Sequence, residues 1–463
     1  MDDQQLALRP GEARCPGPSA HDLIAADPHA PAPLLEQSPL FLGNEDVPFA
    51  NYSSVEFARA EHEHVWSRTC QWACREEHIP NTGDYRIYDI GDRSAIVIRQ
   101  ADGTIAAYHN FCLHRGTQLK PSTAVGGRAK VLRCPFHGWT WSLEGNLVDL
   151  PCQWDFPHVD REAYDLPRIQ VDTWGGWVFV NFDPAAPPLR QYLGVLPEHF
   201  ASWPLDDRYV EAHVLKRLPC NWKAAMEAFL EAYHVLETHS QAITATGDAN
   251  AQYDVFGDHV SRFIHTVGTP SPHLDPQPTE EQMVEFMFAR RYPDAADRPR
   301  LAPGGRAREL LATEVQKRLG EKYGRDFSHL SVSETVDSIE YFVFPNQFFF
   351  PGLDKSMCYR FRPDGDDPSK SIFDLLILRP RPLDGPAPRP PAPTELAVED
   401  SYTLCADLDK GLAMVYDQDT SNMAAQTRGF KGSVKRAQTL GNYQESRARH
   451  LHHTVARYIA HTI

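Results

Sequence analysis

The sequence lacks any apolar run long enough to cross a lipid bilayer. A membrane-spanning helix needs about 20 consecutive apolar residues, whereas the most apolar stretch, residues 341–350, is interrupted by Asn346 and Gln347. Residues 1–33 contain neither the apolar core of a signal peptide nor two adjacent arginines. These absences predict a cytoplasmic protein with no membrane partner.

Basic residues are fewer than acidic ones, and the cysteines give no sign of disulfide pairing. The 46 Lys and Arg residues stand against 62 Asp and Glu residues, which gives a formal net charge of −16. This balance argues against nucleic acid as a partner. The nine cysteines are an odd number and do not suggest a disulfide framework in a chain this long. No glycine-rich nucleotide-binding loop is evident.

The length of 463 residues allows two or three domains, and a composition with 42% hydrophobic and 23% charged residues is that of a globular protein. Residues 1–41, rich in Pro, Ala and Asp, predict a flexible lead-in. Residues 42–190 predict a small antiparallel β domain preceded by a helix, and residues 191–463 predict a larger domain. The predicted fold class is α+β, with the larger domain built on an antiparallel sheet covered by helices.

Short apolar runs separated by Gly and Asp turns predict the strands of the small domain. These runs are residues 85–90, 95–98, 105–108 and 176–181. In the larger domain, longer runs with a period near 3.6 predict helices and apolar β-branched or aromatic runs predict strands. The expected helices are residues 222–237, 398–423 and 446–459, and the expected strands are residues 211–218, 341–350 and 371–378.

Two short runs in the small domain carry the residue types of a metal site. Cys112 and His114 form a Cys-x-His pair, and Cys134 and His137 form a Cys-x-x-His pair, with 19 residues between His114 and Cys134. A [2Fe–2S] cluster of the Rieske type takes two thiolates and two imidazoles. A Cys2His2 zinc site has the same ligand types, but zinc fingers usually place both Cys before both His. The alternating order favours the Rieske cluster.

The residues around these ligands resemble a known family. Residues 110–116 (NFCLHRG) and 134–139 (CPFHGW) are similar to the two cluster loops of the Rieske non-heme iron oxygenases, the aromatic ring-hydroxylating oxygenase α subunits. The resemblance implies a terminal oxygenase that uses O2 and reductase-supplied electrons, with NAD(P)H as the ultimate donor. Its reaction would be dihydroxylation, monohydroxylation or oxidative dealkylation of an aromatic or other apolar organic substrate. The alternative is a Rieske-type electron-transfer protein without oxygenase activity.

Residues 221–239 are similar to the family's Asn-Trp-Lys … Glu … Tyr-His-x4-His signature, and by this resemblance His234 and His239 bind a mononuclear Fe(II). Two His and one carboxylate are a common ligand set for such an iron and leave coordination positions open. Because a regular helix advances about 100° per residue, two positions five apart lie about 140° apart around the axis. The helix must therefore break, or contain a π-type turn, between the two histidines.

The third iron ligand is expected far along the chain, late in the helix predicted for residues 398–423. The resemblance selects Asp419, because Asn422, Met423 and Gln426 follow it as they follow the family's ligand. Asp417 is the competitor.

Glu231 lies three residues before His234 and shares its helix face. In the family, a carboxylate at this position links the cluster His of one subunit to an iron-ligand His of its neighbour, so the resemblance makes Glu231 the electron bridge between subunits. A carboxylate can accept two imidazole N–H groups and fix both rings. Glu227 and Glu237 are the alternatives on the same segment.

The resemblance also implies partners. Electrons would come from a separate reductase, directly or through a ferredoxin, and the assembly would be a homotrimer or an α3β3 complex. An apolar pocket near the iron would bind the small organic substrate and O2. Candidates for its walls, all of which are also candidates for ordinary core packing, are Phe229, Val235, Phe344, Phe348 and Phe350.

Overall fold

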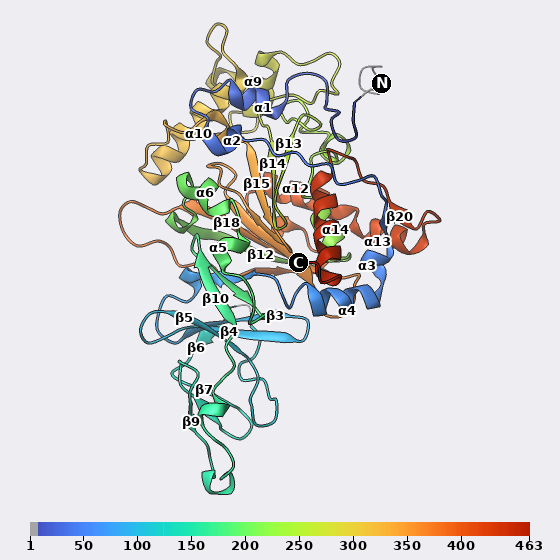
Figure 1. Cartoon of the computed structure of the whole chain (residues 1–463). Coiled ribbons are helices and arrows are strands. Elements are labelled where there is room, and N and C mark those ends of the chain that lie inside the picture. Colours follow the sequence, from blue (N-terminus) through green and yellow to red (C-terminus); the bar gives the residue numbers. More distant parts are fainter. Residues whose placement is uncertain (1–7, 124) are drawn as a thin grey trace.

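The computed structural model describes residues 8–463 except residue 124. Figure 1 shows a larger body of sheet and helices from which a smaller β unit projects, with β7 and β9 near the far end of the projection. No helix in the part of the chain so described is long and apolar enough to cross a membrane. The cytoplasmic location stays a prediction.

The larger body is built on one eight-stranded sheet, in the order β13-β14-β15-β16-β17-β18-β12-β19. Neighbouring strands are antiparallel except β12 and β19, which are parallel. The predicted α+β class is confirmed. The strands are β12 (Arg208–Leu218), β13 (Gln252–Phe256), β14 (Val260–His265), β15 (Ser338–Val343), β16 (Gln347–Phe349), β17 (Met357–Pro363), β18 (Ser371–Pro380) and β19 (Thr394–Leu396).

Both faces of this sheet are buried. Side chains alternate between the two faces along each strand, so the strands contribute to two separate cores. Tyr359, Phe361 and Phe373 lie in one core, which the helices near the C-terminus complete. Tyr341 and Leu376 lie in a second core, shared with two short helices and with the small unit. The helices of these two layers are α5 (Leu189–Tyr192), α6 (Leu196–His199), α7 (Trp222–Glu227), α8 (Val235–Thr238), α12 (Lys410–Ser421), α13 (Met423–Gly432) and α14 (Ser446–Ile459).

Helix α14 matches its predicted range, whereas the helix predicted for residues 398–423 begins only at Lys410. The Asp409 side chain accepts hydrogen bonds from the backbone N–H groups of Gly411 and Leu412, which makes it the N-cap. Three further helices form an excursion beside the sheet: α9 (Glu280–Phe288), α10 (Ala307–Tyr323) and α11 (Val332–Val336).

The small unit contains three antiparallel sheets, ordered β10-β11-β2, β5-β4-β3-β6 and β7-β8-β9. Its strands are β2 (Gln71–Arg75), β3 (Asp84–Ile90), β4 (Arg93–Arg99), β5 (Ile105–His109), β6 (Gly127–Arg128), β7 (Leu132–Arg133), β8 (Thr140–Trp141), β9 (Leu147–Asp149), β10 (Gln170–Trp174) and β11 (Trp177–Asn181). The four strands predicted for this region coincide with β3, β4, β5 and β11.

The lead-in is not the flexible segment expected from its composition. Helices α1 (Ala20–Ala25) and α2 (Ala32–Leu35) bury Ile24 and Leu34 completely. The buried Arg262 guanidinium donates to the backbone carbonyls of Pro33 and Glu36 and so holds this segment against the sheet. Part of the expected lead-in, residues 1–7, lies outside the described residues.

The next segment also packs with the larger body, although the predicted boundary at residue 42 assigned it to the small domain. It contains β1 (Val47–Pro48), α3 (Ala50–Ser53) and α4 (Val55–His64), and β1 pairs with β20 (Ala437–Gln438). Glu61 of α4 accepts hydrogen bonds from the Trp222 indole and the Lys223 ammonium at the start of α7. These contacts between buried charged groups anchor the segment that leads to the histidines.

Candidate metal centres

Two similar tight loops hold the Cys and His pairs of the small unit. In the first, the Gly116 N–H donates to the Cys112 carbonyl at 2.9 Å, and in the second the Gly138 N–H donates to the Cys134 carbonyl at 3.2 Å. Both glycines have positive φ, 74° and 77°, which other residues rarely adopt. The two loops therefore present a thiol and an imidazole each in the same way.

The side chains pair across the two loops, thiol with thiol and imidazole with imidazole. The Cys112 and Cys134 side chains interact directly, and both residues are buried. The His114 and His137 rings lie 4.6 Å apart, and the His114 ring stacks on Trp139 with an interplanar angle of 2°. The buried His114 Nδ1 has no hydrogen-bond partner among the described residues. Two thiols, two imidazoles and one unpartnered ring nitrogen fit a Rieske cluster.

The protonation states suit the same group. Burial, together with the neighbouring His137 and Arg115, lowers the pKa of His114, so the ring is neutral at pH 7. A neutral imidazole is the form that binds metal. Burial raises the pKa of the Cys112 thiol, and a bound cation would favour its thiolate form.

The second constellation lies where the predicted helix of residues 222–237 is broken. Helix α7 ends at Glu227, and α8 is a single turn from Val235 to Thr238. His234 precedes that turn as its N-cap and His239 follows it as its C-cap. The prediction of a break or a π-type turn between the two histidines is wrong: the turn that joins them is α-helical, with the His239 N–H donating to the Val235 carbonyl at 2.9 Å, and the chain leaves the helix before His234, after Glu227. His239 lies just past the end of α8, where the regular helical geometry no longer applies.

His234, His239 and Asp419 come together from segments about 180 positions apart, and their ligand atoms all lie within 4.8 Å of one another. The His239 Nε2 lies 2.7 Å from Asp419 Oδ1, and the His234 Nε2 lies 3.5 Å from the same oxygen. Asp419 is on α12 and is buried. The arrangement offers two imidazoles and one carboxylate on one side of a point, which fits an iron with open positions.

The ring nitrogens that face away from Asp419 are also bonded. His234 Nδ1 lies 2.8 Å from Glu231 Oε1, and the His234 backbone N–H donates to Glu231 Oε2 at 3.0 Å. His239 Nδ1 lies 3.0 Å from Gln418 Oε1. Such contacts fix the tautomer and orientation of a metal-binding imidazole. Gln418 is therefore the group that orients His239.

The charges of the three groups are strongly linked. Burial disfavours protonated His234, but its contacts with Asp419 and Glu231 outweigh burial and raise the pKa to about 10. Burial likewise opposes ionisation of Asp419, and the two histidines nevertheless hold its pKa below the usual range. Without metal, a proton on His234 balances the carboxylates, and a divalent cation would take the place of that proton.

The alternative carboxylates have other partners. Asp417 accepts from the Ser401 hydroxyl at 2.6 Å and from the Tyr402 backbone N–H at 3.0 Å, away from the histidines. Glu237 is exposed on α8. Glu227 is buried and bonded to the side chains of Tyr52, Gln438 and His452. Of these candidates, only Asp419 and Glu231 contact the histidines.

Four residues around Glu227 carried no sequence signal, because they come from three elements far from it in sequence, α3, β20 and α14. The Tyr52 hydroxyl and the His452 Nε2 both lie 2.6 Å from Glu227 Oε1, and Gln438 donates to Glu227 Oε2 at 3.1 Å. Glu445, at the N-cap of α14, lines the same region. Burial raises its pKa to about 7, and the nearby Glu231 and Glu227 add to the effect.

A cavity of about 150 Å³ adjoins the triad. Its walls include His234 and Asp419 and the three carboxylates Glu227, Glu231 and Glu445. None of the five apolar residues expected as pocket walls lines it. Phe229, Phe344, Phe348 and Phe350 belong to the main core, and Val235 belongs to a smaller one. The cavity at the triad is consequently more acidic and less apolar than expected.

Two family matches cover most of the chain. Residues 198–461 match the family described as ring hydroxylating alpha subunit (catalytic domain), which is more than half of the 463 residues. The chain belongs to this family. Residues 69–160 match the Rieske [2Fe-2S] domain. The predicted family is confirmed, and so are the two cofactors, a Rieske [2Fe–2S] cluster and a mononuclear iron.

Curated relatives resemble about half of the chain. The chlorobenzene dioxygenase subunit alpha of Cupriavidus sp. (strain PS12) is 34% identical over 202 residues, covering 42% of this chain and 44% of the relative. The glycine betaine monooxygenase oxygenase subunit of Chromohalobacter salexigens is 31% identical over 231 residues, covering 48% of this chain and 49% of the relative. The aligned part of this chain thus spans about half the length of these relatives or less.

Solved structures share the fold over nearly the whole chain. The quaternary ammonium Rieske monooxygenase CntA aligns with a TM-score of 0.61 at 16% identity, covering 89% of this chain and 95% of that one. Naphthalene 1,2-dioxygenase aligns with a TM-score of 0.62 at 18% identity, covering 92% and 94%. At these identities the likeness establishes the fold.

Proposed function

We propose that this protein is the terminal oxygenase component of a multi-protein system, which uses O2 and electrons from a reductase to hydroxylate a small organic substrate. The observation that carries the proposal is the meeting of His234, His239 and Asp419 within 4.8 Å. An electron carrier needs only the cluster. The same chain holds a second ligand set with open positions, which favours an oxygenase over a carrier without its own catalysis.

Each proposed ligand has a defined task. Cys112, His114, Cys134 and His137 would hold the [2Fe–2S] cluster, and His234, His239 and Asp419 would hold Fe(II), which supplies O2 activation when bound. Glu231 keeps the proton of His234 on Nδ1 and so leaves Nε2 free to face the metal. Gln418 does the same for His239 from the opposite side of the site.

We further propose that electrons pass between subunits. In Figure 1 the strands next to the cluster loops, β7 and β9, lie at the end of the projection, far from the body that carries α8 and α12. The tip exposes apolar side chains, with Trp154 82% and Phe136 56% exposed, as expected of a surface that docks on another chain. A homotrimer or an α3β3 complex would place this tip beside Glu231 of a neighbour. A reductase, directly or through a ferredoxin, remains the proposed donor.

The substrate has two candidates. The ring-hydroxylating relatives support an aromatic or other apolar compound, as in chlorobenzene dioxygenase. The acidic cavity favours a second candidate, a compound with a quaternary or tertiary ammonium group, because Glu227, Glu231 and Glu445 would attract a cation there. Relatives named for glycine betaine and quaternary ammonium oxidation support this second reading.

The test is a substrate screen with a promiscuous reductase, O2 and mass-spectrometric detection of products. One half of the panel is neutral aromatic compounds and the other is ammonium compounds matched in size. Oxygen incorporation into either half supports an oxygenase and selects the substrate class. A fully metallated protein that passes electrons to other acceptors but oxidises no compound of either half contradicts the proposal.

A further inference from the structure

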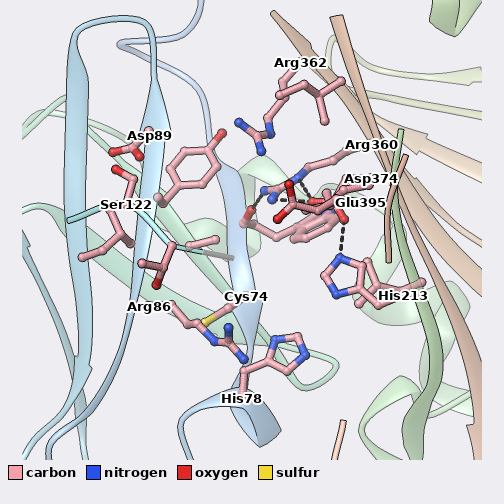
Figure 2. Close-up of a pocket in the computed structure, with 18 of the residues that line it drawn as sticks. Cys74, His78, Arg86, Asp89, Ser122, His213, Arg360, Arg362, Asp374 and Glu395 are labelled. Carbon is pink, nitrogen blue, oxygen red and sulfur yellow. Dashed lines mark hydrogen bonds and ion pairs between the residues drawn. The ribbon is translucent and has the colours of Figure 1, made fainter. Parts of the chain in front are cut away.

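A second cavity, of about 290 Å³, lies between the small unit and the larger body and shares no lining residue with the cavity at the triad. Strands β2 and β3 and the loop at Ser122 form one wall, and β12, β17, β18 and β19 form the other. Figure 2 shows Arg86, His78 and Ser122 on the first side and Arg360, Arg362 and His213 on the second. Its volume is near the lower end of ligand pockets, about 300–1,000 Å³.

The sheet register explains why charge gathers on the second wall. Arg360 is opposite Asp374, and Arg362 is opposite Ile372, which in turn is opposite Arg217 on the next strand. Residues in register across adjacent strands share one face of a sheet. Three arginines are thereby placed on the face that looks toward the small unit.

The Asp374 carboxylate already has two partners, Arg360 and His213. The Arg360 Nε and Nη2 donate to Asp374 Oδ2 at 2.9 and 2.7 Å, and His213 Nε2 lies 2.8 Å from Oδ1. The Arg360 guanidinium also lies 3.7 Å above the Trp72 ring. The charge of Asp374 is therefore balanced by its own neighbours.

Among the described residues of this wall, Arg362 is the arginine without a hydrogen-bonded counterpart. Within the described part of the chain it makes no hydrogen bond or ion pair, and its Nε is buried without a partner. The remaining carboxylates of the lining, Asp89 and Glu395, form no ion pair with it, and Glu395 is exposed. Arg217, by contrast, pairs with Asp364 at 3.1 Å. A half-buried guanidinium left in this state favours an anion beside it.

A neutral donor faces the same space. The Arg75 backbone N–H donates to His78 Nδ1 at 3.2 Å, so the proton of the neutral ring is on Nε2. That Nε2 is buried and has no acceptor among the residues described. Burial and the nearby Arg86 lower the pKa of His78, which keeps the ring neutral. Apolar side chains complete the walls, among them Leu215 and Ile372.

We propose that this cavity is a binding site for a small organic carboxylate, with the carboxylate on Arg362 and the apolar part of the ligand against Leu215 and Ile372. The bound acid would join the two domains of one chain, because Arg362 belongs to the larger body and His78 and Ser122 belong to the small unit. The site is separate from the triad and does not rest on the proposed oxygenase activity.

The test is calorimetric titration of the metallated protein with benzoate, and with benzamide as the uncharged analogue. One benzoate binds per chain, and benzamide binds at least about tenfold more weakly, since a charge-assisted hydrogen bond contributes about 1.5–3 kcal/mol. Arg362→Gln weakens benzoate binding by at least about tenfold. Arg217→Gln, which removes a paired arginine from the rim, leaves the affinity within about twofold.

Two further variants keep the result decisive. Ser122→Glu changes an exposed loop residue of the lining, so the variant is expected to fold even if Arg362→Gln does not. It abolishes benzoate binding, because the new carboxylate competes with benzoate in the cavity. Asp419→Ala alters only the triad and leaves benzoate binding unchanged. The proposal is overturned by equal affinity for benzoate and benzamide, by benzoate binding that survives both Arg362→Gln and Ser122→Glu, by loss of binding in Asp419→Ala, or by tighter binding of inorganic phosphate than of benzoate.

Discussion

The two candidate metal centres are built in opposite ways. The cluster ligands lie within 26 consecutive residues, Cys112–His137, on two loops of similar geometry near the tip of a small β unit. The proposed iron ligands flank α8 and lie on α12, and they meet inside the larger body. A local site depends on turn geometry, which a few glycines and hydrogen bonds determine. A long-range site depends on the packing of the whole domain and on the polar groups that orient each ligand.

The largest effect expected from this contrast is the loss of turnover on removal of one iron ligand. His234→Ala removes an imidazole from the triad but touches neither cluster loop, so product formation falls by more than about 100-fold. The visible spectrum of the cluster stays unchanged. The matched control Glu237→Gln, on the exposed side of α8, keeps turnover within about twofold. Normal turnover by His234→Ala would remove this residue from the site.

The connection between the two centres is tested at Glu231. Glu231→Ala keeps both metals but removes the only side chain described here that holds His234 Nδ1. Electron transfer from the reduced cluster slows by about 10- to 100-fold, measured as single-turnover oxidation of the cluster in the presence of substrate and O2. Glu231→Asp, which keeps the carboxylate, recovers most of the rate. Unchanged kinetics in Glu231→Ala would contradict the bridge.

A smaller effect is expected at Gln418, which orients only the long-range site. Gln418→Ala leaves His239 Nδ1 without its acceptor, and affinity for Fe(II) falls by about tenfold. Titration of the iron-depleted protein measures this change, with the cluster absorbance as internal reference. Asn in place of Gln418 restores less than half of the loss, because its shorter side chain does not reach the ring. A variant that binds Fe(II) as the parent does would show that His239 is oriented by its backbone alone.

The smallest effect is a pH dependence of stability at Glu445. Its pKa is raised to about 7 in the folded protein, above the ordinary value of 4.5. Between these values the folded state holds more protons than the unfolded state, so the free energy of unfolding falls as pH rises through this window. The thermal midpoint of the metal-free protein decreases from about pH 5 to about pH 8. Glu445→Gln flattens this part of the profile, and an unaltered slope would place the titration elsewhere.

The sequence predicted the cluster site more completely than the iron site. The cluster site could be predicted because its four ligands and the glycines beside them lie close together in the sequence. Helix geometry predicted an interruption between His234 and His239, but the chain leaves the helix before both of them, from Ala228 to His234, and the two histidines flank the single turn of α8. Asp417 and Asp419 are two positions apart on one helix, and only the packing of α12 shows that the first caps a turn at Ser401 while the second meets the histidines.

The remaining errors have a common physical cause. Composition suggested a flexible lead-in and the resemblance suggested an apolar active-site pocket, but tertiary packing decides both properties. Ile24 and Leu34 are too few to form a core alone, yet they complete one made by the sheet. The phenylalanines expected around the iron fill the main core instead, and the groups that surround Glu227 come from residues 52, 438 and 452, which tertiary contacts alone bring together.

The most direct test of the account is an iron count on anaerobically reconstituted protein, combined with Mössbauer spectroscopy to separate cluster iron from mononuclear iron. The account predicts about three irons per chain, two of them in the cluster. His234→Ala then retains the two cluster irons, and Cys134→Ser retains only the mononuclear one. A parent protein with two irons per chain, unchanged by His234→Ala, would contradict the existence of the second centre.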